Sequence, residues 1–421
     1  MAEPDRETRV RRPLDALSFF LADVRDGLGP YLAIYLLLVQ DWNPASIGLV
    51  MSVAGAAGIL AQTPAGALVD RTRAKRAVLV AAAVAVTACS LALPLLPQLW
   101  FVLPTQAAAG VAAAVFPPVV AAITLGAVGP KAFARRSGRN EAFNHAGNAA
   151  AALIAGAAAY FFGPVAVFWL MAAMAAASIA AALSVPADAI DHDTARGLPE
   201  HGEGSADAAA PSGWRAVLGC RPLLLFAACT TLFHFANAAM LPLVGQKLAL
   251  LNPELGTTLM SACIVAAQAV MVPVAAVTGA KADRWGRKPF FLVALAVLAA
   301  RGALYPVADD PYWLLSVQLL DGIGAGVFGV LFPLIVADLT RGTGRFNVSL
   351  GAIVTAQGIG AALSNGIAGL VVVRAGYDAA FLFLAAVACA GLALFWLAMP
   401  ETSEERAAGE TRPTLAGTPA G

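Results

Sequence analysis

The sequence predicts an all-α polytopic membrane protein built from two similar halves. Hydrophobic residues make up 59% of its 421 residues and charged residues only 13%, whereas a soluble domain carries about 25% charged residues. Apolar segments of roughly the 20 residues that a helix needs to cross a bilayer recur along the whole chain. Basic loop motifs recur at corresponding places in the two halves. We therefore expect twelve transmembrane helices in two pseudo-symmetric six-helix bundles.

The apolar segments set the predicted spans. They run at 14–39, 44–69, 77–97, 99–128, 139–162 and 164–185 in the first half, and at 221–247, 256–280, 288–307, 312–339, 346–373 and 377–399 in the second. Residues 186–220 are acidic, rich in Gly, Ala and Pro, and without an amphipathic period, which predicts a flexible linker. The expected parts are a polar N-terminal segment 1–13, a bundle 14–185, the linker 186–220, a bundle 221–400 and a disordered tail 401–421.

Lys and Arg accumulate on the cytoplasmic side of membrane proteins. With both termini in the cytoplasm, all but four of the 27 basic residues fall in cytoplasmic segments; the exceptions are Arg25, Lys247, Arg301 and Arg374. We expect a multi-pass protein of the cytoplasmic (inner) membrane with both termini inside. Arg301 lies toward the outer end of its span, so its long side chain is expected to reach the interface and serve only the structure.

Two loop motifs occur once in each half. The sequence GALVDRTRAKR at 66–76 corresponds to GAKADRWGRKP at 279–289, and RRSGR at 135–139 corresponds to RGTGR at 341–345. Their offsets are nearly equal, which indicates a duplicated six-helix unit. Such inverted or parallel repeats are the architecture of transporters whose halves rock against each other.

The first pair of loops resembles the signature G-x-L-a-D-r-x-G-r-k of the major facilitator superfamily, and the resemblance extends from about residue 14 to residue 400. In the first copy the matching residues are Gly66, Leu68, Asp70, Arg71 and Lys75, with Arg73 at the second glycine position. In the second copy they are Gly279, Asp283, Arg284, Gly286, Arg287 and Lys288. The resemblance implies two six-helix bundles that transport by alternating access.

These loops are candidates for a cytoplasmic gate. Glycine permits close helix packing, and Asp can pair with the cations and with helix termini at the membrane rim. Breaking such pairs as the halves rock would favour one state over the other. The candidate gate residues are Gly66, Asp70, Arg71, Gly279, Asp283, Arg284, Gly286 and Arg287. Alternatively, the cations only set the topology.

Two departures bear on the drug:proton antiporter subclass that the family resemblance suggests. These antiporters commonly carry an Arg in the fourth helix four residues before a Gly, and here Gln106 precedes Gly110. They also carry a G-x-x-x-G-P-x-x-G-G-like stretch in the fifth helix. The stretch at 147–156 keeps small residues at this spacing but has no Pro.

Three charges, on Asp23, Arg25 and Asp26, lie in the first apolar span. A charge at mid-bilayer costs about 2.5–3.5 kcal/mol and usually faces a cavity. The two carboxylates share a helix face at spacing i, i+3, so pairing of Arg25 with one leaves the other to carry a proton. Asp321 is the corresponding candidate in the second half. The alternative is an Asp–Arg pair that only holds the first helix to a neighbour.

In the superfamily the first, fourth, seventh and tenth helices line a central cavity, and each carries polar residues here. A further polar stripe, which includes His145 and Asn148, begins the fifth helix. The candidate substrate-cavity residues are Arg25, Gln106, His145, Asn148, His234, Asn237, Gln318 and Gln357. Such residues also occur as plain interhelical hydrogen bonds.

These features favour a secondary transporter over an enzyme, because no loop is long enough to form a soluble domain and no ATP, metal or catalytic motif is present. We expect proton-coupled efflux of a small organic molecule, with the proton gradient as energy source and no cofactor. A proton symporter that imports a sugar or organic acid is the alternative, and a metal or metallophore exporter is less favoured. The expected partners are the substrate, protons and the lipid bilayer, with no nucleic acid, and the chain is expected to be a monomer.

Overall fold

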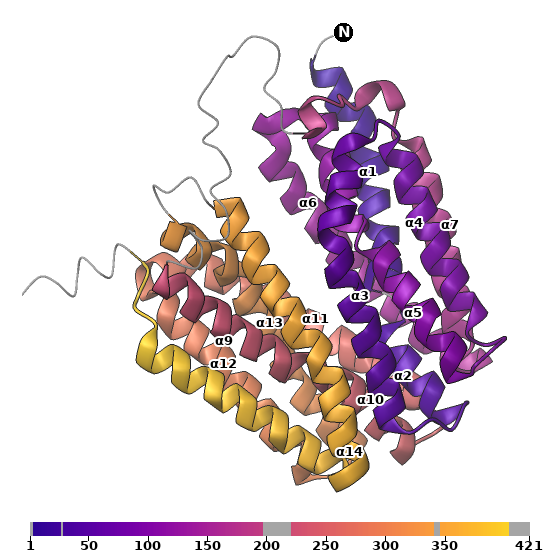
Figure 1. The fold of residues 1–421 in the computed structure, drawn as a ribbon, viewed down its shortest axis with the longest axis vertical. Helices are drawn as coiled ribbons and strands as arrows, with labels where there is room; N and C mark the ends of the chain where they lie inside the picture. Colours follow the sequence, from indigo (N-terminus) through magenta and orange to yellow (C-terminus); the bar gives the residue numbers. More distant parts are fainter. Residues whose placement is uncertain (1–2, 27, 197–219, 341–345, 404–421) are drawn as a thin grey trace, which may run out of the picture.

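The computed structural model describes residues 3–26, 28–196, 220–340 and 346–403, which are almost entirely helical. They form two helical bundles that meet at one end (Figure 1). The first bundle contains α1 (Glu3–Asp26), α2 (Gly29–Leu38), α3 (Pro44–Arg71), α4 (Lys75–Ala92), α5 (Leu99–Ala113), α6 (Phe116–Phe162) and α7 (Ala166–Ser184). The second contains α9 (Arg221–Ala238), α10 (Met240–Leu251), α11 (Gly256–Trp285), α12 (Arg287–Leu304), α13 (Pro311–Thr340) and α14 (Phe346–Ala398).

The helices and the predicted spans do not correspond one to one: two long helices each contain a turn, and some spans are divided between two helices. In α6 and α14 the chain turns at Gly129 and Gly376, whose φ angles of 74° and 88° favour glycine. The first span breaks between α1 and α2, beside the Gly29–Pro30 pair, and the seventh breaks between α9 and α10. By length and composition, nine helical segments of the described chain are able to cross a membrane, and the longest holds two spans joined at Gly376. The predicted all-α fold with two bundles is confirmed.

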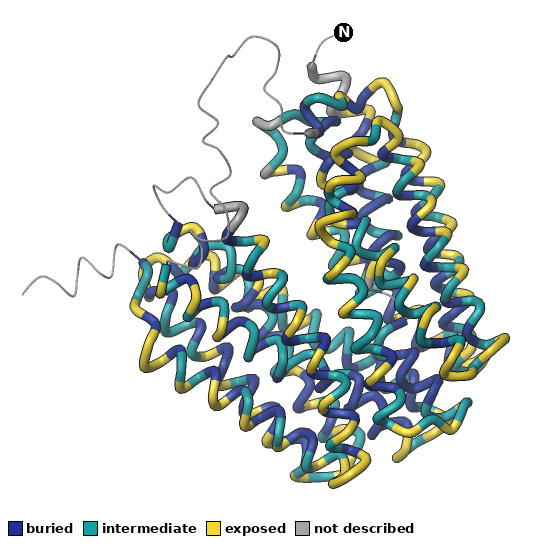
Figure 2. Tube along the Cα trace, in the orientation of Figure 1, coloured by how far each residue is buried: buried dark blue, intermediate teal, exposed yellow. Residues whose placement is uncertain are grey.

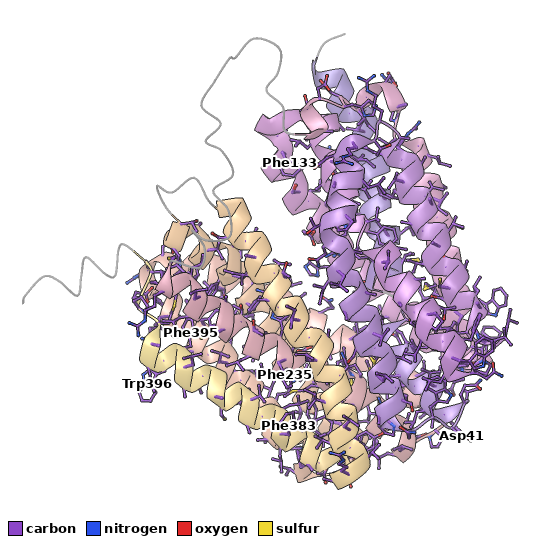
Figure 3. The ribbon with its side chains drawn as sticks, in the orientation of Figure 1. Asp41, Phe133, Phe235, Phe383, Phe395 and Trp396 are labelled. Atoms are coloured by element: carbon purple, nitrogen blue, oxygen red, sulfur yellow. The ribbon has the colours of Figure 1, made fainter. Side chains whose placement is uncertain are left out.

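Each bundle has its own apolar core, and the outer faces are also apolar. Figure 2 shows buried residues between the helices and exposed ones along the outside. Exposed aromatic side chains lie near both ends of the helices: Trp100, Trp169 and Tyr312 near one end, Trp285 and Trp396 near the other. Figure 3 shows Trp396 projecting from α14 away from the bundle. Aromatic belts of this kind mark the two interfaces of a bilayer.

The two bundles touch only over part of their length among the described residues. We call the end that carries the start of α1 and the close of α14 the terminal end, and the other the distal end. In the distal half, Ser52 donates a hydrogen bond to the carbonyl of Ala362, and Thr258 donates one to the carbonyl of Gly156 at 2.9 Å. Toward the terminal end, the two bundles diverge (Figure 1).

Two terminal-end segments, the start of the linker and the start of the tail, differ from the predictions of flexibility and disorder, and a third had no predicted conformation. The polar segment expected before the first span is helical from Glu3, as part of α1. The first part of the linker, 186–196, is packed on α6: the amide of Asp191 donates to the carbonyl of Gly126 at 3.0 Å, and Ile190 is buried. The first tail residues, 401–403, are bound to the second bundle. Residues 197–219 and 404–421 lie outside the described part of the chain.

Candidate functional site

A buried arginine organises the polar centre of the second bundle. The α12 residue Arg301 is only 1% exposed, and its Nη1 forms an ion pair with Asp321 of α13. Its Nη2 donates to Oδ1 of Asn237 on α9 at 2.8 Å, and its Nε contacts Sδ of Met240 at 3.2 Å. The expectation that Arg301 reaches the membrane interface is therefore wrong, because its face of α12 packs against α9 and α13.

The same network continues along α13. Nε2 of Gln318 donates to Oδ2 of Asp321 at 3.0 Å, and Oε1 of Gln318 accepts from the hydroxyl of Tyr305. Gln318 and Tyr305 are fully buried, whereas the side chain of Asp321 is 19% exposed. Buried polar groups are satisfied in this way. Asp321 and Asn237 are the partly exposed members of these contacts.

Arg301, which was expected to serve only the structure, thus lies at the centre of three predicted site residues: Asn237, Gln318 and Asp321. We refer to them with Arg301 and Tyr305 as the Arg301 network. The signal that could have identified Arg301 is its position inside a long apolar run, where an ionisable residue usually pairs within the protein interior.

In the first bundle, α1 and α6 line a pocket with a volume of about 170 Å³. Its polar lining comprises Ser18, Arg25, Ser137, Asn140, Glu141 and Asn144. Arg25 is exposed, and Oε2 of Glu141 accepts from Nδ2 of Asn144 at 3.3 Å. Asp23 is half-buried and does not line this pocket, and Asp26 is the last residue of α1, with a side chain outside the described atoms.

The remaining predicted cavity residues are dispersed. His234 lies within hydrogen-bond distance of the carbonyl of Thr230 on its own helix, with Nδ1 at 3.0 Å, and it packs against the ring of Phe328. Gln106, His145 and Gln357 each have a buried side-chain nitrogen with no hydrogen-bond partner among the described atoms. Asn148 is half-buried on α6. None of these residues has a hydrogen bond to the Arg301 network in the described structure.

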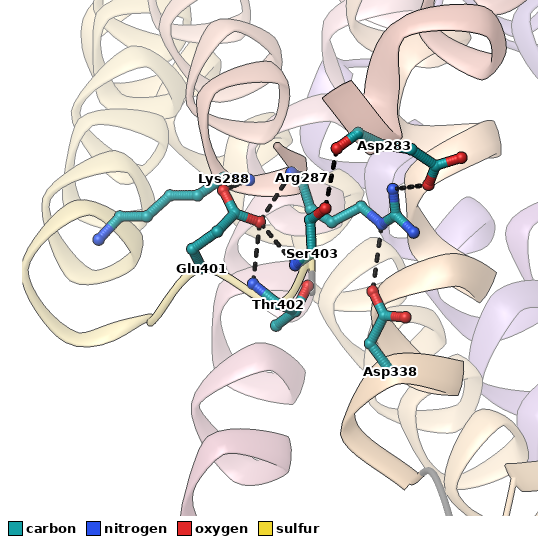
Figure 4. Close-up of polar contacts among 7 residues, drawn as sticks. All are labelled: Asp283, Arg287, Lys288, Asp338, Glu401, Thr402 and Ser403. Atoms are coloured by element: carbon teal, nitrogen blue, oxygen red, sulfur yellow. Dashed lines mark hydrogen bonds and ion pairs between the residues drawn. The ribbon is translucent and has the colours of Figure 1, made fainter. Parts of the chain in front are cut away.

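The second copy of the loop motif is held together by ion pairs and by the start of the tail (Figure 4). Arg287 contacts Asp283 at 2.5 Å and Asp338 of α13 at 3.1 Å. Oε1 of Glu401 accepts from the backbone amide of Arg287 at 2.9 Å, and Oε2 accepts from the amide of Lys288 at 3.1 Å. These amides are at the start of α12, where helix N–H groups lack intrahelical partners. The tail carboxylate therefore caps α12.

The two copies differ at their second glycine position for a conformational reason. Gly286 has φ 92° between α11 and α12, which disfavours any residue with a side chain. In the first copy, Thr72 and Ala74 turn the chain with ordinary φ angles of −86° and −92°. This turn needs no glycine, so Arg73 fits there.

The other gate candidates of both copies lie at the terminal end and are open to solvent. Asp70, Arg71 and Arg284 are exposed. A Cβ atom added to Gly66 or Gly279 would meet no other atom within 4 Å. The close packing expected at these two glycines is therefore absent in this conformation, because the bundles diverge at this end.

Replacing Glu401 with Ala is expected to weaken the start of α12 by about 0.5–2 kcal/mol, since a lost helix cap costs about this much. Hydrogen exchange at the amides of Arg287 and Lys288 should accelerate. Glu254→Ala is the matched control, because Glu254 is exposed and has no described hydrogen bond. Equal exchange in both variants would contradict the capping role of Glu401.

The chain is similar to known proteins over almost its whole length. The family model described as Major Facilitator Superfamily matches residues 15–345 and again residues 266–419. The chain belongs to the major facilitator superfamily. Two proteins of Mycobacterium tuberculosis, named uncharacterized MFS-type transporter MT2531 and Rv2456c, are each 62% identical to it over 409 residues, which is 97% of both chains.

Solved structures of the same fold include the nucleoside transporter NupG. A mutant of NupG matches with a TM-score of 0.74 at 14% identity, and NupG itself with 0.68 at 16% identity. Each match covers 92% of this chain and 99% of the other. At this identity the likeness shows the fold alone. Family membership makes the chain a multi-pass secondary carrier and not an enzyme.

Proposed function

We propose that this superfamily member couples a proton gradient to efflux of a small organic molecule across the cytoplasmic membrane. It works as a monomer with both termini in the cytoplasm, and it uses no cofactor. The bundles alternate between the observed conformation, closed at the distal end, and one that is closed at the terminal end. The partial contact between α3 and α14, which is confined to the distal half, supports this alternation.

The proposal of proton coupling rests on the ion pair between Asp321 and Arg301. Protonation of Asp321 removes the counter-charge of a guanidinium that is 1% exposed. An unpaired charge in such a place is strongly unfavourable, so the guanidinium of Arg301 must move toward water or toward another hydrogen-bond acceptor. The helices that carry these three residues are α12, α13 and α9. Proton binding at the exposed edge of Asp321 therefore changes how three helices of one bundle pack.

We assign substrate binding to the pocket between α1 and α6 that Arg25 lines, together with Asp321 of the second bundle. Asp23, at half-buried depth on α1, is the second candidate for a proton-binding group. The gate candidates of both loop motifs close the terminal end in the other state of the cycle. In the observed conformation the space beside Gly66 and Gly279 is open, which agrees with this role.

The proposal predicts that Asp321→Asn and Asp23→Asn lose transport driven by a pH gradient in proteoliposomes while still exchanging substrate with no gradient. The reason is that an amide keeps the shape of the carboxylate but carries no titratable proton. Asp309→Asn is the matched control, because Asp309 is an exposed carboxylate at the distal end, paired with Lys247. Undiminished gradient-driven transport by Asp321→Asn would refute the coupling role of this residue.

A second candidate is a proton symporter that imports an organic acid or a sugar. The pocket that Arg25 lines also contains Glu141, Ser18 and Asn144, and this mixture of charged and neutral hydrogen-bonding groups suits a sugar or an organic acid. Counterflow measured in vesicles of defined sidedness separates import from efflux. A screen of substrates in the same vesicles should include nucleosides, the compounds that NupG is named for transporting.

A further inference from the structure

A second pocket, at the terminal end of the first bundle, is strongly basic. It has a volume of about 360 Å³ and lies between α1 and α6. Its lining consists of Val10, Arg11, Val128, Arg135, Arg136 and Arg139. Four of these six side chains carry a positive charge, and none of the described lining residues is a carboxylate. No step of the proposed transport cycle uses it.

The carboxylate of Asp15 holds two of the arginines in place. Arg136, which is 6% exposed, contacts Oδ1 of Asp15 at 2.7 Å, and its Nε donates to Oδ1 of Asn140 at 3.0 Å. Arg139 binds both oxygens of Asp15, at 2.8 and 2.7 Å, and lies 5.0 Å from the ring centre of Phe143. Burial lowers the pKa of Arg136, and its hydrogen bond to Asp15 opposes this change. The guanidinium groups are therefore held in place before any ligand arrives.

Among the described residues, Asp15 is shared between Arg136 and Arg139, so these two guanidinium groups and that of Arg11 at the exposed edge outnumber the one carboxylate. Arg135 is also exposed at this edge. Arg9, on another side of α1, is paired separately with Asp188 at 3.3 Å. The pocket thus presents clustered donors with a net positive charge, the arrangement that binds phosphate groups through charge-assisted hydrogen bonds.

The depth of the pocket identifies the source of the phosphate. The apolar run of α1 begins at Leu14, three residues after Arg11, and the apolar run of α6 ends at Val128. The pocket therefore lies where the hydrocarbon core gives way to the headgroup layer, and Val10 and Val128 supply an apolar wall. Basic pockets between transmembrane helices at this depth bind anionic lipid headgroups.

We propose that Arg11, Arg135, Arg136 and Arg139 form a binding site for the phosphate headgroup of an anionic phospholipid. The bound lipid joins the start of α1 to the segment of α6 that follows the Gly129 turn. It would thereby add a link between the first helix and the loop that joins the fourth and fifth spans.

The test uses the full chain in nanodiscs of phosphatidylcholine, with and without phosphatidylglycerol. Native mass spectrometry measures retained phosphatidylglycerol, and thermal unfolding measures its stabilising effect. Arg11→Gln and Arg135→Gln should each weaken phosphatidylglycerol binding about five-fold, since one arginine near a charged surface contributes about this factor. Arg221→Gln, which removes an exposed arginine at the same end of the other bundle, should leave binding unchanged.

Thermal unfolding in pure phosphatidylcholine checks that the variants fold. The native protein and the three variants should have the same unfolding temperature there. Equal phosphatidylglycerol retention by Arg135→Gln and Arg221→Gln would overturn the proposal. An arm with inorganic phosphate and no phosphatidylglycerol tests the other source of the same chemistry. Stabilisation by inorganic phosphate that requires Arg135, with no preference for the lipid, would assign the site to a soluble anion and overturn the lipid assignment.

Discussion

Replacing Asp321 with Leu is expected to destabilise the second bundle by about 3–5 kcal/mol, the usual effect of removing one partner of a buried ion pair. Arg301, which is 1% exposed, would keep only Asn237 and the Met240 sulfur as hydrogen-bond partners among the described residues. Gln318 would also lose the acceptor for its side-chain amide. Unfolding of the purified protein in mild detergent, followed by far-UV circular dichroism over a denaturant series, measures the change.

A double variant separates the missing charge from the altered shape. Arg301→Met combined with Asp321→Leu removes both charges, and apolar replacement of a buried pair is often neutral. The double variant should therefore recover most of the lost stability, while still failing to couple transport to a pH gradient. A double variant that is no more stable than Asp321→Leu alone would show that the loss arises from packing and not from the unpaired arginine.

A second large effect is expected from Gly48→Leu, which places a side chain in the distal contact between the bundles. A Cβ atom at Gly48 would lie 2.2 Å from the carbonyl oxygen of Asn365 on α14. Overpacking of this kind costs about 1–3 kcal/mol, which changes a two-state ratio by about 5–150-fold. The population should move from the observed conformation toward one that is open at the distal end, and transport should fall accordingly.

Gly66→Leu is the matched variant on the same helix, because its Cβ meets no atom in the observed conformation. If the terminal end closes during the cycle, leucine there should hold the protein in the observed state. Thiol labelling of Thr63→Cys, an exposed position in the terminal half of α3, reports the difference in a background without native cysteines. Labelling should slow in Gly48→Leu and persist in Gly66→Leu. The same labelling rate in both would contradict movement of the bundles about this contact.

The spans were predictable because a bilayer imposes a length on every apolar segment. The predicted boundary between the spans 346–373 and 377–399 coincides with the turn at Gly376, although α14 continues through it. The division of the seventh span between α9 and α10 was not predicted. The Asn237–Asp321 part of the network followed from polar residues in apolar runs. Arg301 did not, because the helix face on which it lies depends on how α12 packs.

The loop motifs show the same limit. Their recurrence was visible in the sequence, but the backbone that makes Gly286 necessary and Arg73 acceptable depends on the angle between successive helices. The ion pair of Arg287 with Asp338 joins residues on separate helices, and sequence spacing gives no register between them. The remaining gate and cavity assignments stay predictions.

The cap that Glu401 places on α12 has a practical consequence for protein engineering. Truncation after Met399, at the apparent end of the last helix, would remove both the cap and the hydrogen bond from Ser403 to the carbonyl of Asp283. A purification tag or fluorescent reporter fused at that point would alter the same loop. Fusions should keep the native chain through Ser403, so that an inactive fusion is not mistaken for an inactive transporter.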